Sequence, residues 1–175
     1  IHRPVLPPAG LPFRVFARVE DPDGITSVIL NYRVDPAAAY ASTSMNDDGI
    51  DGDQLAGDGI FTARISGQDA STLVGFYVEA EDMGSAATTF PENASANGAE
   101  CFARIGEGTQ PGPFATYRFW VSEATLADWI ALPFLANNPL PATIVYGDQR
   151  VFYNSGSYYG GARDTHNSPL GNPVG

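Results

Sequence analysis

The sequence predicts a predominantly all-β protein whose main part is an antiparallel β-sandwich. Short stretches in which apolar and polar residues alternate recur about every ten residues over the first hundred positions, and Gly, Pro, Asp and Asn separate them. No stretch in this part has the spacing of an amphipathic helix. Because alternation buries one face of each strand, the strands are expected to form two sheets packed face to face.

The expected strands cover residues 13–20, 28–34, 40–45, 60–65, 72–82, 87–90 and 101–105. The strand over 72–82 has the clearest alternation. Its core-facing side is expected to carry Val74, Phe76, Val78 and Ala80. An Asp-Pro-Asp-Gly turn at 21–24 ends the first strand, because Pro fixes φ, Asp caps its own backbone and Gly accepts unusual dihedrals.

The pattern changes after the Gly- and Pro-rich stretch 106–113, which predicts a boundary between a sandwich over 1–112 and a second unit over 113–175. The second unit is expected to hold a strand over 117–121, a short helix and a hairpin over 143–153. Ser122 is the expected N-cap of the helix, which should end at Pro133. Residues 154–175 are rich in Gly, Ser, Asn and Pro, so this unit is predicted to be a small, incomplete α+β segment.

Charge and composition exclude several function classes. The chain has 20 acidic and 9 basic residues, all nine of them Arg, and a net charge of −11. Such a chain repels phosphate backbones and anionic lipid, so nucleic-acid binding is not expected. No apolar run reaches the roughly 20 residues of a membrane span. The single cysteine, Cys101, cannot form an internal disulfide and is expected to be a small buried residue.

The strongest local signal is an acidic loop after the strand over 40–45. Its five carboxylates are Asp47, Asp48, Asp51, Asp53 and Asp58. Oxygen ligands on a loop bent by glycine are what Ca²⁺ prefers, so these residues are candidate calcium ligands. The loop is not an EF-hand, since Gly49 falls at the third position and Asp58 stands where the long Glu is required. The alternative is a solvated hairpin loop in which Asp and Gly serve only as turn residues.

A second acidic group comprises Glu20, Asp21, Asp23, Glu79, Glu81 and Asp82. Ordinary strand-end turns are the expected explanation for this group. His2 and His166 lie near the two ends, and neither is expected to be held rigidly enough to act as a base. The sequence therefore predicts no enzyme activity for this chain. Trp120, Trp129, Tyr158 and Tyr159 are candidate contacts for a sugar or a partner if they are exposed. Core packing is the favoured role for these aromatic residues, since Trp129 lies in the apolar stripe of the expected helix.

Several stretches together resemble an arrangement found in large exported bacterial proteins: an immunoglobulin-like module followed by a spore-coat-protein-H-type (CotH) kinase-like domain. They are VEDPDGI at 19–25, AGDGIF at 56–61, VGFYVEA at 74–80, ECFAR at 100–104, TYRFW at 116–120 and YGDQRVFYNSG at 146–156. The resemblance implies that 1–112 has an immunoglobulin-like fold and that 113–175 is the N-terminal fragment of a CotH-like domain. Kinase-like chemistry needs a lysine-type phosphate contact, and the chain has no Lys, so phosphotransfer residues are expected outside it.

We therefore expect a non-catalytic structural or adhesive module of a larger extracellular or cell-surface protein, stabilised by Ca²⁺. One alternative is the accessory N-terminal part of a CotH-type atypical kinase, and another is a carbohydrate-binding module. The expected partners are the rest of a larger chain, other protein subunits or surface glycans.

Overall fold

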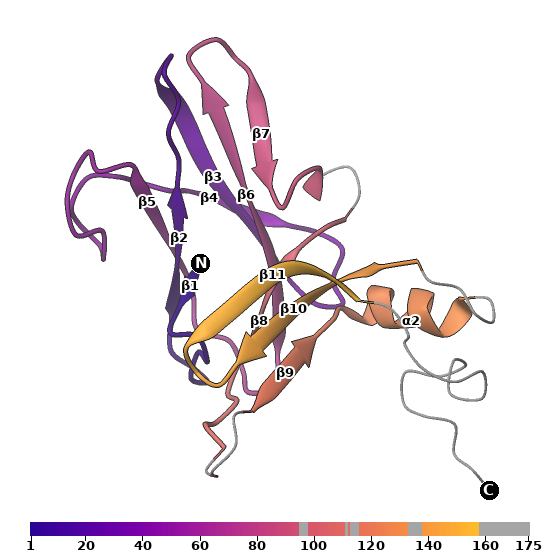
Figure 1. Ribbon diagram of the computed structural model, residues 1–175. Coiled ribbons are helices and arrows are strands. Elements are labelled where there is room, and N and C mark those ends of the chain that lie inside the picture. The colour runs from indigo at the N-terminus through magenta and orange to yellow at the C-terminus, as the bar shows by residue number, and fades with distance from the viewer. Residues whose placement is uncertain (95–97, 111, 113–115, 133–137, 158–175) are drawn as a thin grey trace, which may run out of the picture.

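The computed structural model describes residues 1–94, 98–110, 112, 116–132 and 138–157 (Figure 1). All strand pairings between its named strands are antiparallel, and the described residues form a single α-helix, α2 (Glu123–Ala131). The predicted all-β class is confirmed. In the described part of the chain, no helix has the length and apolarity needed to cross a membrane.

Two sheets form the sandwich. The first has the strand order β1 (His2–Arg3), β2 (Phe13–Arg18) and β5 (Ile60–Ile65). The second has the order β4 (Ala41–Ser44), β3 (Ile25–Val34), β6 (Leu73–Asp82) and β7 (Ala87–Phe90), and β8 (Cys101–Arg104) pairs with the other half of β6. In the second sheet, the long central strands β3 and β6 thus carry shorter strands on both sides.

The main core lies between these sheets. The predicted inward face of β6 is confirmed, since Val74, Phe76, Val78 and Ala80 all belong to the buried cluster. They meet Phe13 and Val15 from β2 and Ala63 and Ile65 from β5. Cys101 is also buried in this cluster, as expected.

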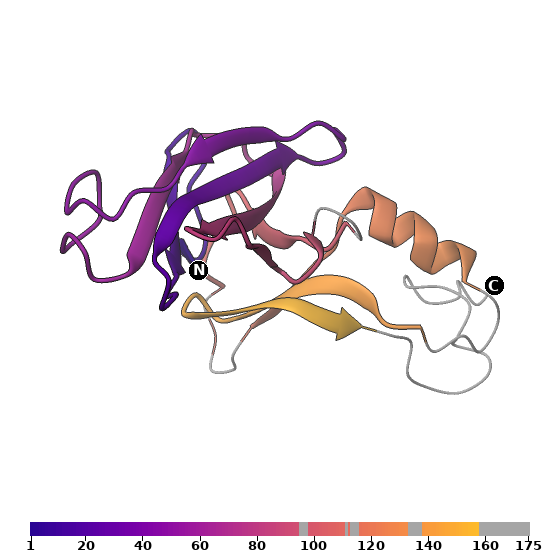
Figure 2. The same ribbon diagram turned by 90° about the horizontal axis from the view of Figure 1, so that it is seen from above.

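A third sheet with the order β11 (Arg150–Ser157), β10 (Leu140–Tyr146) and β9 (Tyr117–Trp120) lies beside the sandwich with α2 (Figure 2). A second buried cluster joins it to the sandwich. The cluster contains Val5, Leu73 and Phe102 from the sandwich and Trp120 and Val145 from the third sheet. The division into units over 1–112 and 113–175 stays a prediction, but the two parts share this apolar contact.

Two elements of the second unit, the helix and the hairpin, can be compared with their predicted bounds. The helix begins as predicted, because the Ser122 hydroxyl accepts a hydrogen bond from the Thr125 N–H at 3.0 Å. The expectation that regular structure stops at Tyr153 is wrong, since β11 continues to Ser157. Gly156 and Ser157 pair with Pro141 and Leu140 of β10, so a partner strand orders residues that have little strand propensity of their own.

Candidate functional site

The loop between β4 and β5 brings together three of the five predicted calcium ligands. Asp47, Asp53 and Asp58 each offer one carboxylate oxygen, and these atoms lie within 4.8 Å of one another. Asp48 and Asp51 are exposed and lie outside this group. We call Asp47, Asp53 and Asp58 the cation loop triad.

Asp47 ties the start of the loop to its end. Its carboxylate accepts hydrogen bonds from the backbone N–H groups of Gly57, Asp58 and Gly59 at 2.7, 3.2 and 2.9 Å. Gly57 and Gly59 have φ values of +76° and +79°, a region that favours glycine and aims these N–H groups inward. The Gly-Asp-Gly stretch therefore serves as a nest for one carboxylate.

Asp53 is the most deeply buried member of the triad, at 7% exposure. Its Oδ2 accepts a hydrogen bond from the Gly49 N–H at 2.6 Å, and Asp58 Oδ1 accepts one from the Ile60 N–H at 2.9 Å. Among the described residues, none donates a hydrogen bond to the second oxygen of either carboxylate. Those oxygens are hard ligands of the kind that Ca²⁺ binds.

The triad has an electrostatic reason to bind a cation. Two unit negative charges up to 4.8 Å apart repel by about 3 kcal/mol or more at an effective dielectric constant of about 20. The backbone N–H donors offset part of this repulsion between the carboxylates. A divalent cation bound between them would offset the rest, because it attracts each carboxylate.

Asp51 and Gly52 attach the loop to the first sheet. Arg14 of β2 donates from Nε to the backbone oxygen of Asp51 at 2.7 Å. A Cβ at Gly52 would lie 2.1 Å from Arg14 Nε, and Gly52 has a φ of +103°. The positive φ favours glycine at this position, and a side chain there would displace Arg14 from its contact with the loop, which sequence spacing does not reveal.

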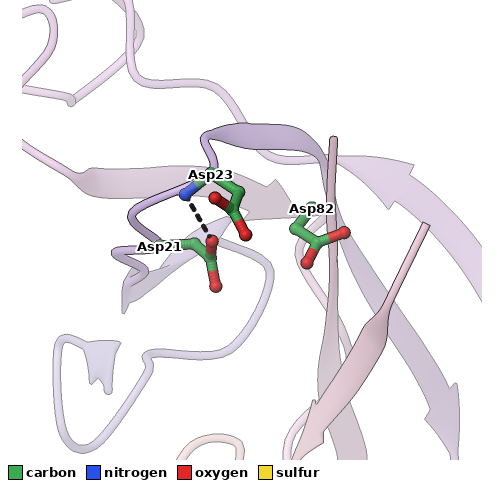
Figure 3. Close-up of side chains that lie close together, drawn as sticks. All are labelled: Asp21, Asp23 and Asp82. Carbon is green, nitrogen blue, oxygen red and sulfur yellow. Dashed lines mark hydrogen bonds between the residues drawn. The ribbon is translucent and has the colours of Figure 1, made fainter. Parts of the chain in front are cut away.

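Only part of the second acidic group comes together, at the exposed end of β6. Asp21, Asp23 and Asp82 approach one another there (Figure 3), whereas Glu79 and Glu81 do not belong to the cluster. Asp21 Oδ1 accepts from the Asp23 N–H, and Asp82 Oδ1 accepts from the Ala86 N–H, both at 2.8 Å. These bonds are the turn bonds that the ordinary explanation predicts.

His2 was expected to lie in a loosely held end of the chain, but it is held in the core. Its ring is fully buried, with Nε2 2.9 Å from the Val5 oxygen and Nδ1 2.6 Å from the Tyr153 hydroxyl. Burial lowers the pKa of His2 to about 4. The prediction that no scaffold holds His2 is wrong, because β1 pairs with β2 and Tyr153 of β11 covers the ring. His166 lies outside the described residues.

Trp120 is a core residue. It is 3% exposed in the second cluster, and its Nε1–H donates to Glu107 Oε1 at 3.3 Å. Its candidate role as a sugar or partner contact is therefore wrong, and the favoured core-packing role is confirmed. Tyr158 and Tyr159 lie outside the described residues, so their role stays a prediction.

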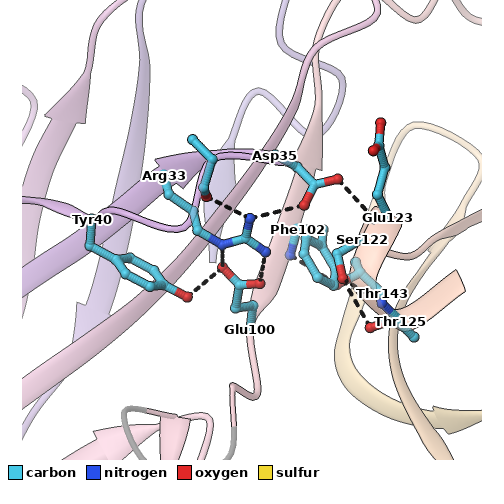
Figure 4. A network of polar contacts seen from close by, with 10 residues as sticks. Arg33, Asp35, Tyr40, Glu100, Phe102, Ser122, Glu123, Thr125 and Thr143 are labelled. Atoms are coloured by element: carbon cyan, nitrogen blue, oxygen red, sulfur yellow. Dashed lines mark hydrogen bonds and ion pairs between the residues drawn. The ribbon is translucent and has the colours of Figure 1, made fainter. Parts of the chain in front are cut away.

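A buried ionic network surrounds Arg33 (Figure 4), and no sequence pattern predicted it. Arg33 Nε and Nη2 donate to the two oxygens of Glu100 at 2.7 and 2.5 Å, and Nη1 donates to Asp35 Oδ1 at 2.9 Å. The Tyr40 hydroxyl donates to Glu100 Oε1 at 2.7 Å. Burial and the hydrogen bond to the Glu100 carboxylate raise the pKa of Tyr40 to about 12.

The network connects the sandwich to the helix. Asp35 Oδ2 accepts a hydrogen bond from the Glu123 N–H at 2.9 Å, in the first turn of α2. Nearby, the Phe102 N–H donates to Thr143 Oγ1 at 3.0 Å (Figure 4). Arg33 and Glu100 are 67 positions apart, so no motif spacing could have joined them.

No protein-family model matches the chain, and a search of curated proteins found no match either.

Proposed function

We propose that the chain is a non-catalytic structural module of an extracellular or cell-surface assembly, and that Ca²⁺ bound by the cation loop triad stabilises it. The observation that carries this proposal is the convergence of Asp47, Asp53 and Asp58, with two carboxylate oxygens left without a protein donor. Three carboxylates supply fewer than the six to eight oxygens of a full Ca²⁺ site, so backbone oxygens and water complete the shell. An affinity of about 10⁻⁴ to 10⁻³ M, typical of extracellular modules, is expected.

The placement of the reactive side chains supports a structural role. His2 is buried among aromatic rings and hydrogen-bonded to Tyr153. Cys101 is buried, and burial raises the pKa of its thiol, which disfavours the reactive thiolate. Both side chains are almost fully buried, at 0% exposure for His2 and 1% for Cys101, and serve the core.

Calcium titration by isothermal calorimetry tests the proposal. Asp53→Asn is expected to abolish the binding heat, because it removes the charge of the buried ligand while keeping its shape. Asp51→Asn is the matched control, since its side chain lies in the same loop outside the triad. No heat from the wild-type chain at millimolar Ca²⁺, or equal loss in both variants, would refute calcium binding by the triad.

A second candidate is the accessory N-terminal part of a CotH-type kinase-like domain. One observation favours it: β10 and β11 form a hairpin over 140–157, and the stretch 146–156, which resembles the opening strands of that domain, supplies its turn and most of β11. Under this proposal, a longer form of the protein that includes residues beyond Gly175 gains thermal stability with ATP and Mg²⁺, while the 175-residue chain does not. Equal stability of both forms with and without nucleotide would count against it.

A further inference from the structure

The imidazole ring of His2 lies at the junction between the sandwich and the third sheet. Phe13 and Phe76 of the sandwich have ring centroids 5.9 and 6.1 Å from it. Trp120 and Tyr153 of the third sheet have ring centroids 6.4 and 5.9 Å from it. Figure 1 and Figure 2 both show the N-terminus beside the β10–β11 hairpin. Both parts of the molecule therefore enclose this ring.

Hydrogen bonds determine where the neutral ring carries its proton. Nε2 of His2 lies 2.9 Å from the Val5 oxygen, which can only accept, so we assign the proton to Nε2. Nδ1 then accepts, and the Tyr153 hydroxyl donates to it at 2.6 Å. The same hydroxyl oxygen accepts the backbone N–H of His2 at 2.8 Å. Each ring nitrogen thus has a partner, and one of the two partners belongs to the third sheet.

A second proton on the ring breaks this arrangement. It occupies Nδ1, so the hydroxyl proton of Tyr153 loses its acceptor. Leaving a buried donor without an acceptor is unfavourable, and so is a buried charge without a counter-charge. The protonated form of His2 is therefore incompatible with the contact that Tyr153 makes in the folded chain.

The surroundings of His2 do not compensate a positive charge. The Ile1 amine and Arg3, from its own end of the chain, are cations that disfavour it. Cys101 of β8 and Tyr153 of β11 are the titratable side chains nearby, and burial raises the pKa of each, so both are neutral. The elements β2, β6 and β9 present aromatic rings. Burial first, and then the two cations, lower the pKa of His2 to about 4.

We propose that the hydrogen bond between His2 and Tyr153 is an acid-sensitive latch that holds the third sheet on the sandwich. A protonated imidazole needs water, which reaches it when the third sheet moves away with Tyr153. A hydrated imidazole has a pKa of about 6.5, so acid stabilises the released state increasingly as the pH falls below this value. The Phe102 N–H, which donates to Thr143 Oγ1 across the same junction at 3.0 Å, becomes exposed on release.

This inference goes beyond the proposed calcium site and uses a different part of the molecule. The cation loop triad lies between β4 and β5, whereas the latch joins β1 to β11. Acid also protonates carboxylates and would weaken Ca²⁺ binding. The test is therefore made in excess chelator, so that the latch and the calcium site can fail separately.

Amide hydrogen exchange followed by NMR, from about pH 6.5 to about pH 3.5, tests the latch. Exchange is expressed as protection factors, which remove its intrinsic dependence on pH. The protection factor of Phe102 is expected to fall by about tenfold or more in acid, while those of the β3–β6 amides are retained. An unchanged Phe102, or an equal fall in β3–β6, overturns the latch. A fall confined to the amides that pair β1 with β2 also overturns it, since β1 would then leave alone.

A variant pair assigns the effect to the ring. His2→Gln cannot be protonated and is expected to keep the protection of Phe102 in acid. Arg3→Gln, the neighbouring control with an intact latch, is expected to lose it as the wild-type chain does. An equal fall in a folded His2→Gln chain would contradict the assignment. If His2→Gln does not fold, the wild-type chain decides: the His2 ring and the Phe102 protection should change at the same pH, and separate midpoints would contradict the latch.

Discussion

Glu100→Ala removes the centre of the buried Arg33 network. The carboxylate accepts two bonds from Arg33, at 2.7 and 2.5 Å, and one from Tyr40 at 2.7 Å. The side chains of Arg33 and Glu100 are 9% and 3% exposed. Removing one partner of a buried ion pair destabilises a protein by about 3–5 kcal/mol, because the remaining charge is left uncompensated.

The contacts that Arg33 keeps decide where the loss of stability in Glu100→Ala falls within that range. Arg33 keeps Asp35 and the Ala37 oxygen, both at 2.9 Å, so a loss near the lower limit, about 3 kcal/mol, is expected. Tyr40→Phe removes a single hydrogen bond to the same carboxylate and should lower the free energy of unfolding by about 1–2 kcal/mol. Exposed Glu92→Ala is the control, with a change within about 0.5 kcal/mol.

Urea unfolding followed by circular dichroism measures these differences through the transition midpoint at constant m. The order of loss should be Glu100→Ala, then Tyr40→Phe, then Glu92→Ala. A Glu100→Ala loss equal to or below that of Tyr40→Phe would refute the argument that the ion pair is desolvated and central.

Three further predictions use other buried groups. The pKa of His2 is about 4 in the folded chain and about 6.5 in the unfolded chain. Between these pH values the unfolded state binds more protons than the folded state, so the free energy of unfolding falls as the pH drops from 6.5 to 4. The loss should reach about 3 kcal/mol by urea unfolding, and an equal pH dependence in His2→Gln would contradict it. Gly75→Ala should lower the free energy of unfolding by about 1–3 kcal/mol, because the alanine Cβ would lie 2.2 Å from Glu100 Oε1. Thermal unfolding measures the change, and an unchanged Tm would argue against this tight contact. Cys101 should resist alkylation until the chain unfolds, as followed by mass spectrometry, and rapid labelling of the native chain would show that its burial is wrong.

Local patterns predicted those elements whose signals are contained within a few residues. The alternation over 72–82 identified β6 and its buried face, and Ser122 identified the start of α2. The Asp-rich loop was also recognised from composition, although only its folded path separates Asp47, Asp53 and Asp58 from Asp48 and Asp51.

Features that depend on contacts far apart in the sequence could not be predicted in this way. His2 is buried because it meets Tyr153, 151 positions later, and β1 is only two residues long. β11 extends through Gly156 because β10 lies beside it, against the propensity of its own residues. In each case tertiary pairing overrides the local signal.

Thermal unfolding with Ca²⁺ and then with excess chelator tests the central claim most directly. The wild-type chain and the Asp51→Asn control should both lose several degrees in Tm on chelation, because ligand binding to the folded state alone stabilises it. Asp53→Asn should show the same low Tm in both conditions. Identical Tm values for the wild-type chain with Ca²⁺ and with chelator would contradict a stabilising calcium site at Asp47, Asp53 and Asp58.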